Sequence, residues 1–116
     1  MKRDMKLVRA LLSRIEEDDA LDGSAGFAAN EFTMPEHSPE EVAFHVLLLL
    51  DAGLLRGSSE TSIPMIERLT WQGCEFLDDT RDPEIWAKTL KAASGAGIAL
   101  AWELAKAEIK KKLHLP

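Results

Sequence analysis

The stretch that decides the predicted fold runs from residue 38 to residue 56: Ser38-Pro-Glu-Glu-Val-Ala-Phe-His-Val-Leu-Leu-Leu-Leu-Asp-Ala-Gly-Leu-Leu-Arg56. It opens with a serine followed three residues later by a glutamate, the pattern of a capping box, with proline at the first helical position. Glycine at position 53 is typical of the residue just after a helix. These signals predict a helix over Ser38–Ala52, followed by a strand at Leu54–Arg56.

The residues after this strand predict a second strand that returns beside it. Residues 57–62, Gly-Ser-Ser-Glu-Thr-Ser, are typical of a turn. Residues 63–69 follow as the returning strand, with Pro64 near its start, where a missing backbone N–H has the least effect. A helix followed by a hairpin predicts a winged-helix-like domain with its wing.

The N-terminal side of this stretch predicts a first helix over about Asp4–Asp18. Its apolar residues recur at the spacing of one helical stripe, namely Met5, Val8, Leu11, Leu12 and Ile15. Residues 19–26 are rich in loop-forming residues. Residues Phe27–Thr33 predict a short strand, on a weak alternation of apolar residues.

The C-terminal side predicts three further helices. The first has Thr70 as its cap and carries Trp71, Cys74, Phe76 and Leu77, and the second opens with Asp82-Pro83 and carries Ile85, Trp86 and Leu90. Residues 94–97 interrupt the helical pattern. The last predicted helix carries Ile98, Trp102, Ala105 and Ile109 and ends in Lys110, Lys111 and Lys112, at the pole that favours cations. Because the tryptophans lie on apolar stripes, Trp71, Trp86 and Trp102 are expected in the core.

The expected fold class is therefore mainly α with a small β-hairpin. A length of 116 residues fits one domain, and 46% hydrophobic with 29% charged residues is an ordinary globular composition. The prediction is a single domain over residues 1–116. It has a winged-helix-like core over about 4–80 and a C-terminal helical extension over about 83–113.

The charge of the chain is acidic and unevenly distributed. A net charge of −6 argues weakly against binding of nucleic acid through bulk electrostatics. Residues 19–60 contain one basic and eight acidic side chains, whereas residues 83–116 contain six basic and three acidic ones. An acidic middle and mildly basic ends suit self-association, head to middle, as well as an anionic ligand.

The cellular compartment is predicted from cysteine content and hydropathy. The single cysteine, Cys74, cannot form an internal disulfide and suits a reducing cytosol. The longest apolar run, Val46–Leu50, is too short to span a membrane, and no signal peptide is expected. We therefore expect a cytoplasmic protein.

Four blocks of the sequence resemble the domain of unknown function 2513 family. They are Met1-Lys-Arg-Asp-Met-Lys-Leu-Val-Arg9, Phe44-His-Val-Leu-Leu-Leu-Leu-Asp-Ala-Gly-Leu-Leu55, Arg68-Leu-Thr-Trp-Gln-Gly-Cys-Glu-Phe-Leu-Asp78 and Asp82-Pro-Glu-Ile-Trp-Ala-Lys88. The resemblance covers most of the chain except about residues 19–36. It implies a bacterial, often prophage-associated protein, and a fold more than an activity. The helix-Ala-Gly-Leu and Leu-Thr-x-x-Gly steps are also similar to those of winged-helix transcription regulators.

One position departs from the family pattern and bears on function. The position of Leu47 is commonly polar or basic in that pattern, and here Val42–Leu50 contains no lysine or arginine. A DNA-recognition helix exposes polar and basic side chains, whereas a helix that is apolar all round is predicted to be covered on both sides. Two covers stay open, the C-terminal helices folded back or the same surface of a second chain, and the predicted contacts with this cover are Phe44, Leu47 and Leu48.

No complete set of catalytic or cofactor-binding residues is found in the sequence. Glu41 and His45 have the spacing of two metal ligands but lack a third, so a locally bonded histidine is favoured. Cys74 with His45 is a conceivable nucleophile and base, but a buried cysteine that acts as a small hydrophobic residue is favoured. We expect no cofactor, no metal and no enzymatic activity.

The leading prediction is a winged-helix-like binding domain that associates with itself or with a protein partner in a bacterial or prophage regulatory context. The alternative is a sequence-specific DNA-binding regulator that uses the 38–52 helix and the wing. The contacts with nucleic acid predicted for that alternative are Arg56, Arg68, Lys110, Lys111 and Lys112.

Overall fold

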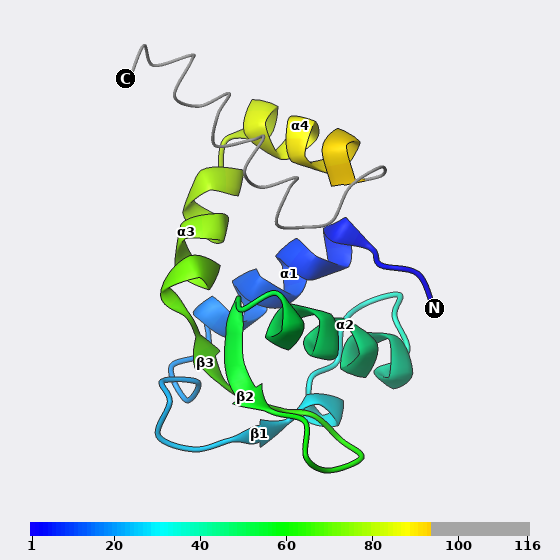
Figure 1. The fold of residues 1–116 in the computed structure, drawn as a ribbon, viewed down its shortest axis with the longest axis vertical. Helices are drawn as coiled ribbons and strands as arrows, with labels where there is room; N and C mark the ends of the chain where they lie inside the picture. Colours follow the sequence, from blue (N-terminus) through cyan, green and yellow to red (C-terminus); the bar gives the residue numbers. More distant parts are fainter. Residues whose placement is uncertain (94–116) are drawn as a thin grey trace. The chain divides into compact units, whose positions relative to one another are not determined.

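The computed structural model describes residues 1–93, and Figure 1 shows its elements. They are α1 (Met5–Glu16), β1 (Phe27–Ala28), the short 3₁₀ helix η1 (Ala29–Glu31), α2 (Pro39–Asp51), β2 (Leu55–Ser58), β3 (Met65–Leu69), α3 (Trp71–Thr80) and α4 (Pro83–Ala93). This part of the chain is mainly helical with one small antiparallel sheet, as predicted, and is consistent with a winged-helix-like arrangement. The predicted last helix, with Trp102 and Lys110–Lys112, lies outside the described residues.

The chain divides into two compact units, Met1–Cys74 and Glu75–Pro116. The division falls within α3, so this helix begins in the first unit and ends in the second. The first unit contains α1, α2 and the whole sheet, whereas the predicted winged-helix-like core, over about residues 4–80, also included all of α3. A single domain with its core ending near residue 80 stays a prediction.

The helix α1 begins and buries its stripe as predicted. The Asp4 carboxylate accepts the N–H groups of Lys6 (3.0 Å) and Leu7 (3.3 Å), which would otherwise lack partners at the start of the helix. The predicted stripe is buried, together with Leu7. Since α1 contacts α2 and β3, this stripe forms part of the core of the first unit.

The helix α2 has the predicted start and end. Ser38 Oγ accepts the N–H of Glu41, and the Glu41 carboxylate accepts the N–H of Ser38, so the capping box is formed. Gly53 has a φ of 74°, a conformation that favours glycine and ends the helix. These caps account for both ends of α2.

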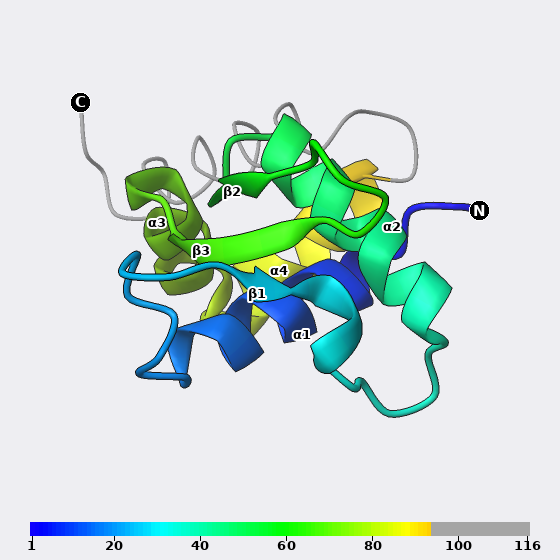
Figure 2. The same ribbon diagram turned by 90° about the horizontal axis from the view of Figure 1, so that it is seen from below.

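The sheet has the strand order β1-β3-β2, and all neighbouring strands are antiparallel (Figure 2). β2 and β3 form the predicted hairpin, but its turn lies later than predicted. Gly57 and Ser58 belong to β2, whereas Ile63 and Pro64 lie in the turn. A bulge after Arg56 lengthens β2 in this way.

Gly57 permits the close approach of the two hairpin strands. A Cβ atom at this position would overlap the carbonyl oxygen of Met65 on β3. A side chain at residue 57 would therefore push the strands apart, and glycine is required beside the bulge. The hairpin register, with Ser58 opposite Met65, depends on this contact.

The predicted strand Phe27–Thr33 is wrong beyond its first two residues. After β1 pairs with β3, the chain turns into η1, and the Phe32 N–H donates to the Ala29 carbonyl (3.1 Å). Burial does not alternate after Ala28, because Asn30 and Glu31 are both exposed, so a longer strand would have no continuous buried face. Phe32 is instead buried after the turn, with the Arg14 guanidinium 5.3 Å from its ring centroid.

The helices α3 and α4 begin at the predicted caps. The Gly73 N–H donates to Thr70 Oγ1 (3.0 Å), and the N–H groups of Glu84 and Ile85 donate to the Asp82 carboxylate. None of the helices within residues 1–93 is long and apolar enough to cross a membrane.

Two expectations for α3 are wrong, because its buried face is rotated from the predicted one. The buried residues of α3 are Gly73, Phe76, Leu77 and Thr80. Gly73 sets this face, since a Cβ there would overlap the carbonyl oxygen of Leu54. Trp71 is consequently 77% exposed, and Cys74 is exposed rather than buried. Trp86 on α4 is half-buried, with its ring edge-to-face against Phe76.

Candidate functional site

The helix α2 has a buried inner face and an apolar outward face. The inner face consists of Val42, His45, Val46 and Leu49, each at most 1% exposed. On the outward face Phe44 and Leu48 are half-buried, and Leu47 is 37% exposed. At about 100° per residue these three side chains lie opposite the buried four. The structure therefore brings the predicted partner contacts together on one surface.

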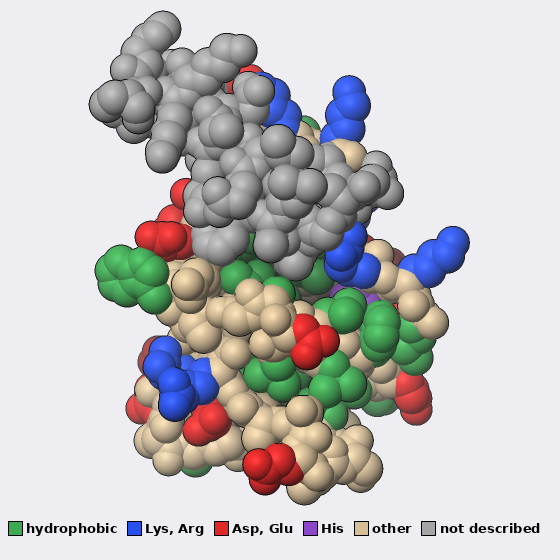
Figure 3. Space-filling view, in the orientation of Figure 1, with side chains coloured by type: hydrophobic (Ala, Val, Ile, Leu, Met, Phe, Trp, Pro, Cys, Tyr) green, Lys and Arg blue, Asp and Glu red, His purple; other side chains and the backbone are tan. Residues whose placement is uncertain are grey.

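The described chain does not complete the predicted cover of this helix. Within the first unit α2 packs on α1, η1 and β2, and these elements bury its inner face. Figure 3 shows hydrophobic side chains gathered over the outer side of α2. Cover of Leu47 by a partner stays a prediction.

Acidic side chains lie at both ends of the outward face. Glu40 in the first turn and Asp51 at the last position of α2 are both exposed. Figure 3 shows acidic groups at both ends of the hydrophobic patch over α2. The last turn of α2 contains no basic residue, so Asp51 lies at the negative pole of the helix dipole without compensation from its own turn. This placement is unfavourable for the helix and favourable for a cation that binds there.

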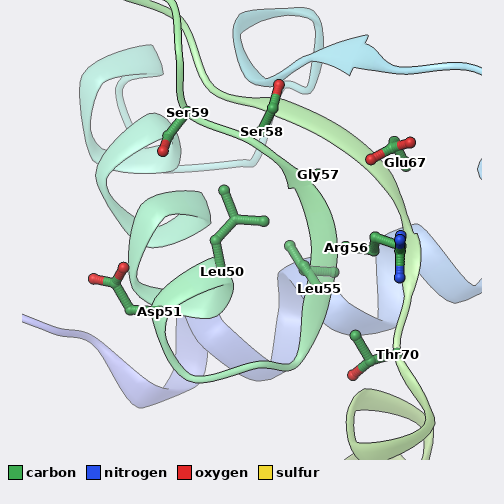
Figure 4. Close-up of a pocket in the computed structure, with 9 residues that line it drawn as sticks. All are labelled: Leu50, Asp51, Leu55, Arg56, Gly57, Ser58, Ser59, Glu67 and Thr70. Atoms are coloured by element: carbon green, nitrogen blue, oxygen red, sulfur yellow. The ribbon is translucent and has the colours of Figure 1, made fainter.

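A groove of about 550 Å³ continues this surface between the C-terminal end of α2 and the hairpin (Figure 4). Leu50 and Leu55 project toward each other between α2 and β2, and Ser59 lies above them. Leu50 is three residues after Leu47, so the groove adjoins the outward face.

The groove has more acidic than basic groups. Its lining includes the carboxylates of Asp51 and Glu67 and the single guanidinium of Arg56. Thr70 also lines it, but its hydroxyl is engaged, donating to the Gly53 carbonyl (2.6 Å) and accepting the N–H of Gly73 (3.0 Å). The lining fits a basic or hydrogen-bonding side chain of a partner better than an anion.

The arginines predicted to contact nucleic acid are neighbours on the hairpin. Arg56 and Arg68 lie directly opposite each other on β2 and β3, and therefore on one face of the sheet. Arg68 is half-buried, and its Nη1 donates to the Leu69 carbonyl (2.8 Å), whereas Arg56 is exposed. The remaining predicted contacts, Lys110, Lys111 and Lys112, lie outside the described residues.

His45 has a structural position that accounts for both of its ring nitrogens. Its Nε2 accepts the backbone N–H of Asp4 (2.8 Å), so the proton of the neutral ring resides on Nδ1, which donates to the Glu41 carbonyl (2.8 Å). The locally bonded histidine is confirmed. Within residues 1–93 no group of three His, Cys, Asp or Glu side chains could hold a metal ion.

Glu41 also has a local role. The hydrogen bond from His37 Nδ1 (3.1 Å) and then that from the Ser38 N–H hold the pKa of the Glu41 carboxyl below its usual value. The Glu41 carboxylate therefore stabilises the start of α2 through these hydrogen bonds.

Comparison with known proteins identifies the family. The family model described as Hypothetical protein (DUF2513) matches residues 2–99. The chain belongs to this family. A curated relative of this DUF2513 chain, named "Uncharacterized protein" and found in Haemophilus influenzae, is 37% identical over 90 residues, covering 74% of this chain and 73% of the relative. No solved structure is significantly similar to this chain.

Sequence reasoning missed the groove and the link from His45 to Asp4. The groove brings Asp51 and Glu67 together from separate elements, and no local pattern predicts that contact. A signal for the link was present, however. The third residue of α1 is Leu7, which cannot accept the cap N–H as Glu41 does in α2, so another acceptor was needed.

Proposed function

We propose that this chain is a non-enzymatic, winged-helix-like binding domain that associates with a second copy of itself through the outward face of α2. The observation that carries the proposal is the 37% exposure of Leu47 between two half-buried apolar neighbours. The setting proposed for it is the cytoplasm of a bacterium, in host or prophage regulation. A relative from a bacterium supports the bacterial part of this setting.

The physical reason is the cost of leaving this surface in water. Burial of apolar area stabilises an association by about 25 cal/mol per Å² before the entropic cost of association is subtracted. Leu47 is the most exposed residue of the patch and requires no rearrangement of the inner face to reach a partner. Association with a partner that covers Leu47 therefore lowers the free energy and does not disturb the packing of the inner face.

The test is the variant Leu47→Lys. The wild-type protein is expected to show a mass that rises with concentration in analytical ultracentrifugation. Leu47→Lys is expected to weaken this association by about tenfold or more, the size of effect seen for residues central to an interface. Because the side chain is exposed, its melting temperature as a monomer is expected to stay near that of the wild type.

The chain offers a matched control in Ile63→Lys. Ile63 lies in the hairpin turn and is 38% exposed, nearly the same as Leu47, and the charge change is identical. Association is expected to survive Ile63→Lys. A wild-type protein that is monomeric at all concentrations, or equal loss in both variants, would overturn the proposal.

Binding of DNA is the second candidate function, and the facing pair of Arg56 and Arg68 on the hairpin favours it. Against it, α2 presents leucine where a reading helix presents polar side chains, and two carboxylates line the groove beside Arg56. Gel shifts with duplex DNA at two salt concentrations separate the candidates. Tight binding that falls steeply with salt and is lost in Arg56→Ala would place DNA binding first.

A further inference from the structure

The outward face of α2 has a charge pattern that restricts what can cover it. Its centre is apolar around Leu47, its two ends have the exposed carboxylates of Glu40 and Asp51, and the adjoining groove adds Glu67. The last turn of α2 provides no cation to balance Asp51. A complementary occupant has an apolar stripe that ends in basic side chains.

The same face of a second copy does not fit this pattern. If two α2 helices packed antiparallel, Glu40 of each would approach Asp51 of the other, and if they packed parallel, each acid would approach its own counterpart. Both arrangements place like charges together, which disfavours the contact. Self-association through α2 therefore requires a different surface of the second copy.

One stretch of this sequence has the required pattern, and it lies outside the described residues. Its apolar residues, at helical spacing, are Ile98, Trp102, Ala105 and Ile109. Its four basic residues, Lys106, Lys110, Lys111 and Lys112, exceed its two acidic ones, Glu103 and Glu108, and leave a net charge of +2. Three of the four lysines stand together at one end. The stretch has 15 residues, and α2 has 13.

We infer that the occupant of the outward face of α2 is the basic segment 98–112 of a second copy of this chain. This inference rests on the proposed self-association and names its partner surface. The apolar stripe lies on Leu47 and its neighbours, and the lysine-rich end lies over Asp51 and Glu67. Reciprocal exchange, with each segment on the α2 of the other copy, gives a closed dimer rather than an open chain.

Charge reversal on each side of this contact tests the inference in the full-length protein. The first variant is Asp51→Lys, and the second combines Lys110→Glu, Lys111→Glu and Lys112→Glu. Each variant alone places like charges at both contacts of the dimer. Each is expected to associate at least about tenfold more weakly than the wild type in analytical ultracentrifugation at low salt. Asp51→Lys also removes an acid from the negative pole of α2, so its monomer is expected to melt no lower than the wild type.

The decisive measurement is the equimolar mixture of the two variants. In the mixed dimer both contacts regain opposite charges, so association is expected to return to within about threefold of the wild type. If the segment docked on α2 of its own chain, mixing the two variants would not restore association. Asp19→Lys makes the same charge change at another exposed position and is expected to leave association unchanged.

Three results would overturn the inference. A mixture that stays as weak as its components excludes the charged contact between copies. Stronger association of Asp51→Lys points to packing of α2 on α2, since lysine would then meet Glu40. A mass that is monomeric throughout excludes any second copy. If Leu47→Lys still disperses the wild-type assembly while the mixture fails, the proposed self-association stands and only its partner surface is wrong.

Discussion

At the scale of single residues, His45 joins two helices that are distant in the sequence. It accepts the N–H of Asp4 at the start of α1 while it lies in the middle of α2. The capping box of α2 satisfies the equivalent N–H with its own Glu41. The α1 helix has a leucine at the corresponding position and relies on the imidazole of another helix.

Removal of this acceptor is expected to destabilise the fold. In His45→Leu the Asp4 N–H would lose its buried partner, at a cost of about 1–3 kcal/mol in the free energy of unfolding. His45→Gln keeps an acceptor of similar reach and is expected to recover part of the loss. Urea unfolding at low protein concentration measures both variants. A His45→Leu protein as stable as the wild type would show that water replaces the bond without cost.

The lowered pKa of Glu41 predicts how stability depends on pH. A carboxyl whose pKa is lower in the folded than in the unfolded state stabilises the fold above its unfolded pKa, and this contribution is lost as the pH falls through the folded pKa. At pH 7 the Glu41→Gln variant is therefore expected to melt at a lower temperature than the wild type. The difference should narrow below about pH 4.5, the usual value for glutamate. A difference that is constant from pH 7 to pH 3 would contradict this origin.

At the scale of elements, the hairpin depends on a glycine that sequence analysis placed in the turn. Gly57→Ala is expected to destabilise the protein by about 1–3 kcal/mol, because the new methyl group would meet the Met65 carbonyl and force the strands apart. Ser58→Ala, at the next and exposed position, is the control and is expected to change stability by less than about 0.5 kcal/mol. Thermal melting of the two variants provides the comparison.

The elements that could be predicted are those whose signals are local. The capping box and Gly53 mark both ends of α2, and the apolar stripe of α1 is periodic, so both helices were predicted to within two residues of their ends. The rotation of α3 could not be predicted in this way. It follows from the approach of Gly73 to Leu54, a contact between elements that no helical periodicity encodes.

The candidate site was likewise only partly predictable from the sequence. Leu47 was identified from the sequence because an unbroken apolar run has no polar side to present to water. The groove was not identified, since it needs the hairpin to bring Glu67 near Asp51. Sequence reasoning therefore reached one face of α2, and the structure added the acidic groove beside it.

At the scale of the whole molecule, charge is separated along the chain, and this predicts a salt dependence. The acidic residues 19–60 and the basic residues 83–116 attract each other between copies in the proposed dimer. The screening length falls from about 10 Å at 0.1 M salt to about 3 Å at 1 M salt. Self-association is therefore expected to weaken severalfold in 1 M sodium chloride without being abolished, because the apolar contact at Leu47 remains. Sedimentation at the two salt concentrations measures this effect. An association that strengthens with salt would show that charge attraction does not stabilise the dimer.

The bond between Asp4 and His45 also has a consequence for the order of events during synthesis. The two residues are 41 positions apart, and ribosomes add about 5–20 residues per second, so the acceptor is made about 2–8 s after the donor. During this interval α1 can form its own turns, but the N–H of its cap residue Asp4 remains in water. The nascent chain thus cannot make this bond before His45, the seventh of the 13 residues of α2, has been translated.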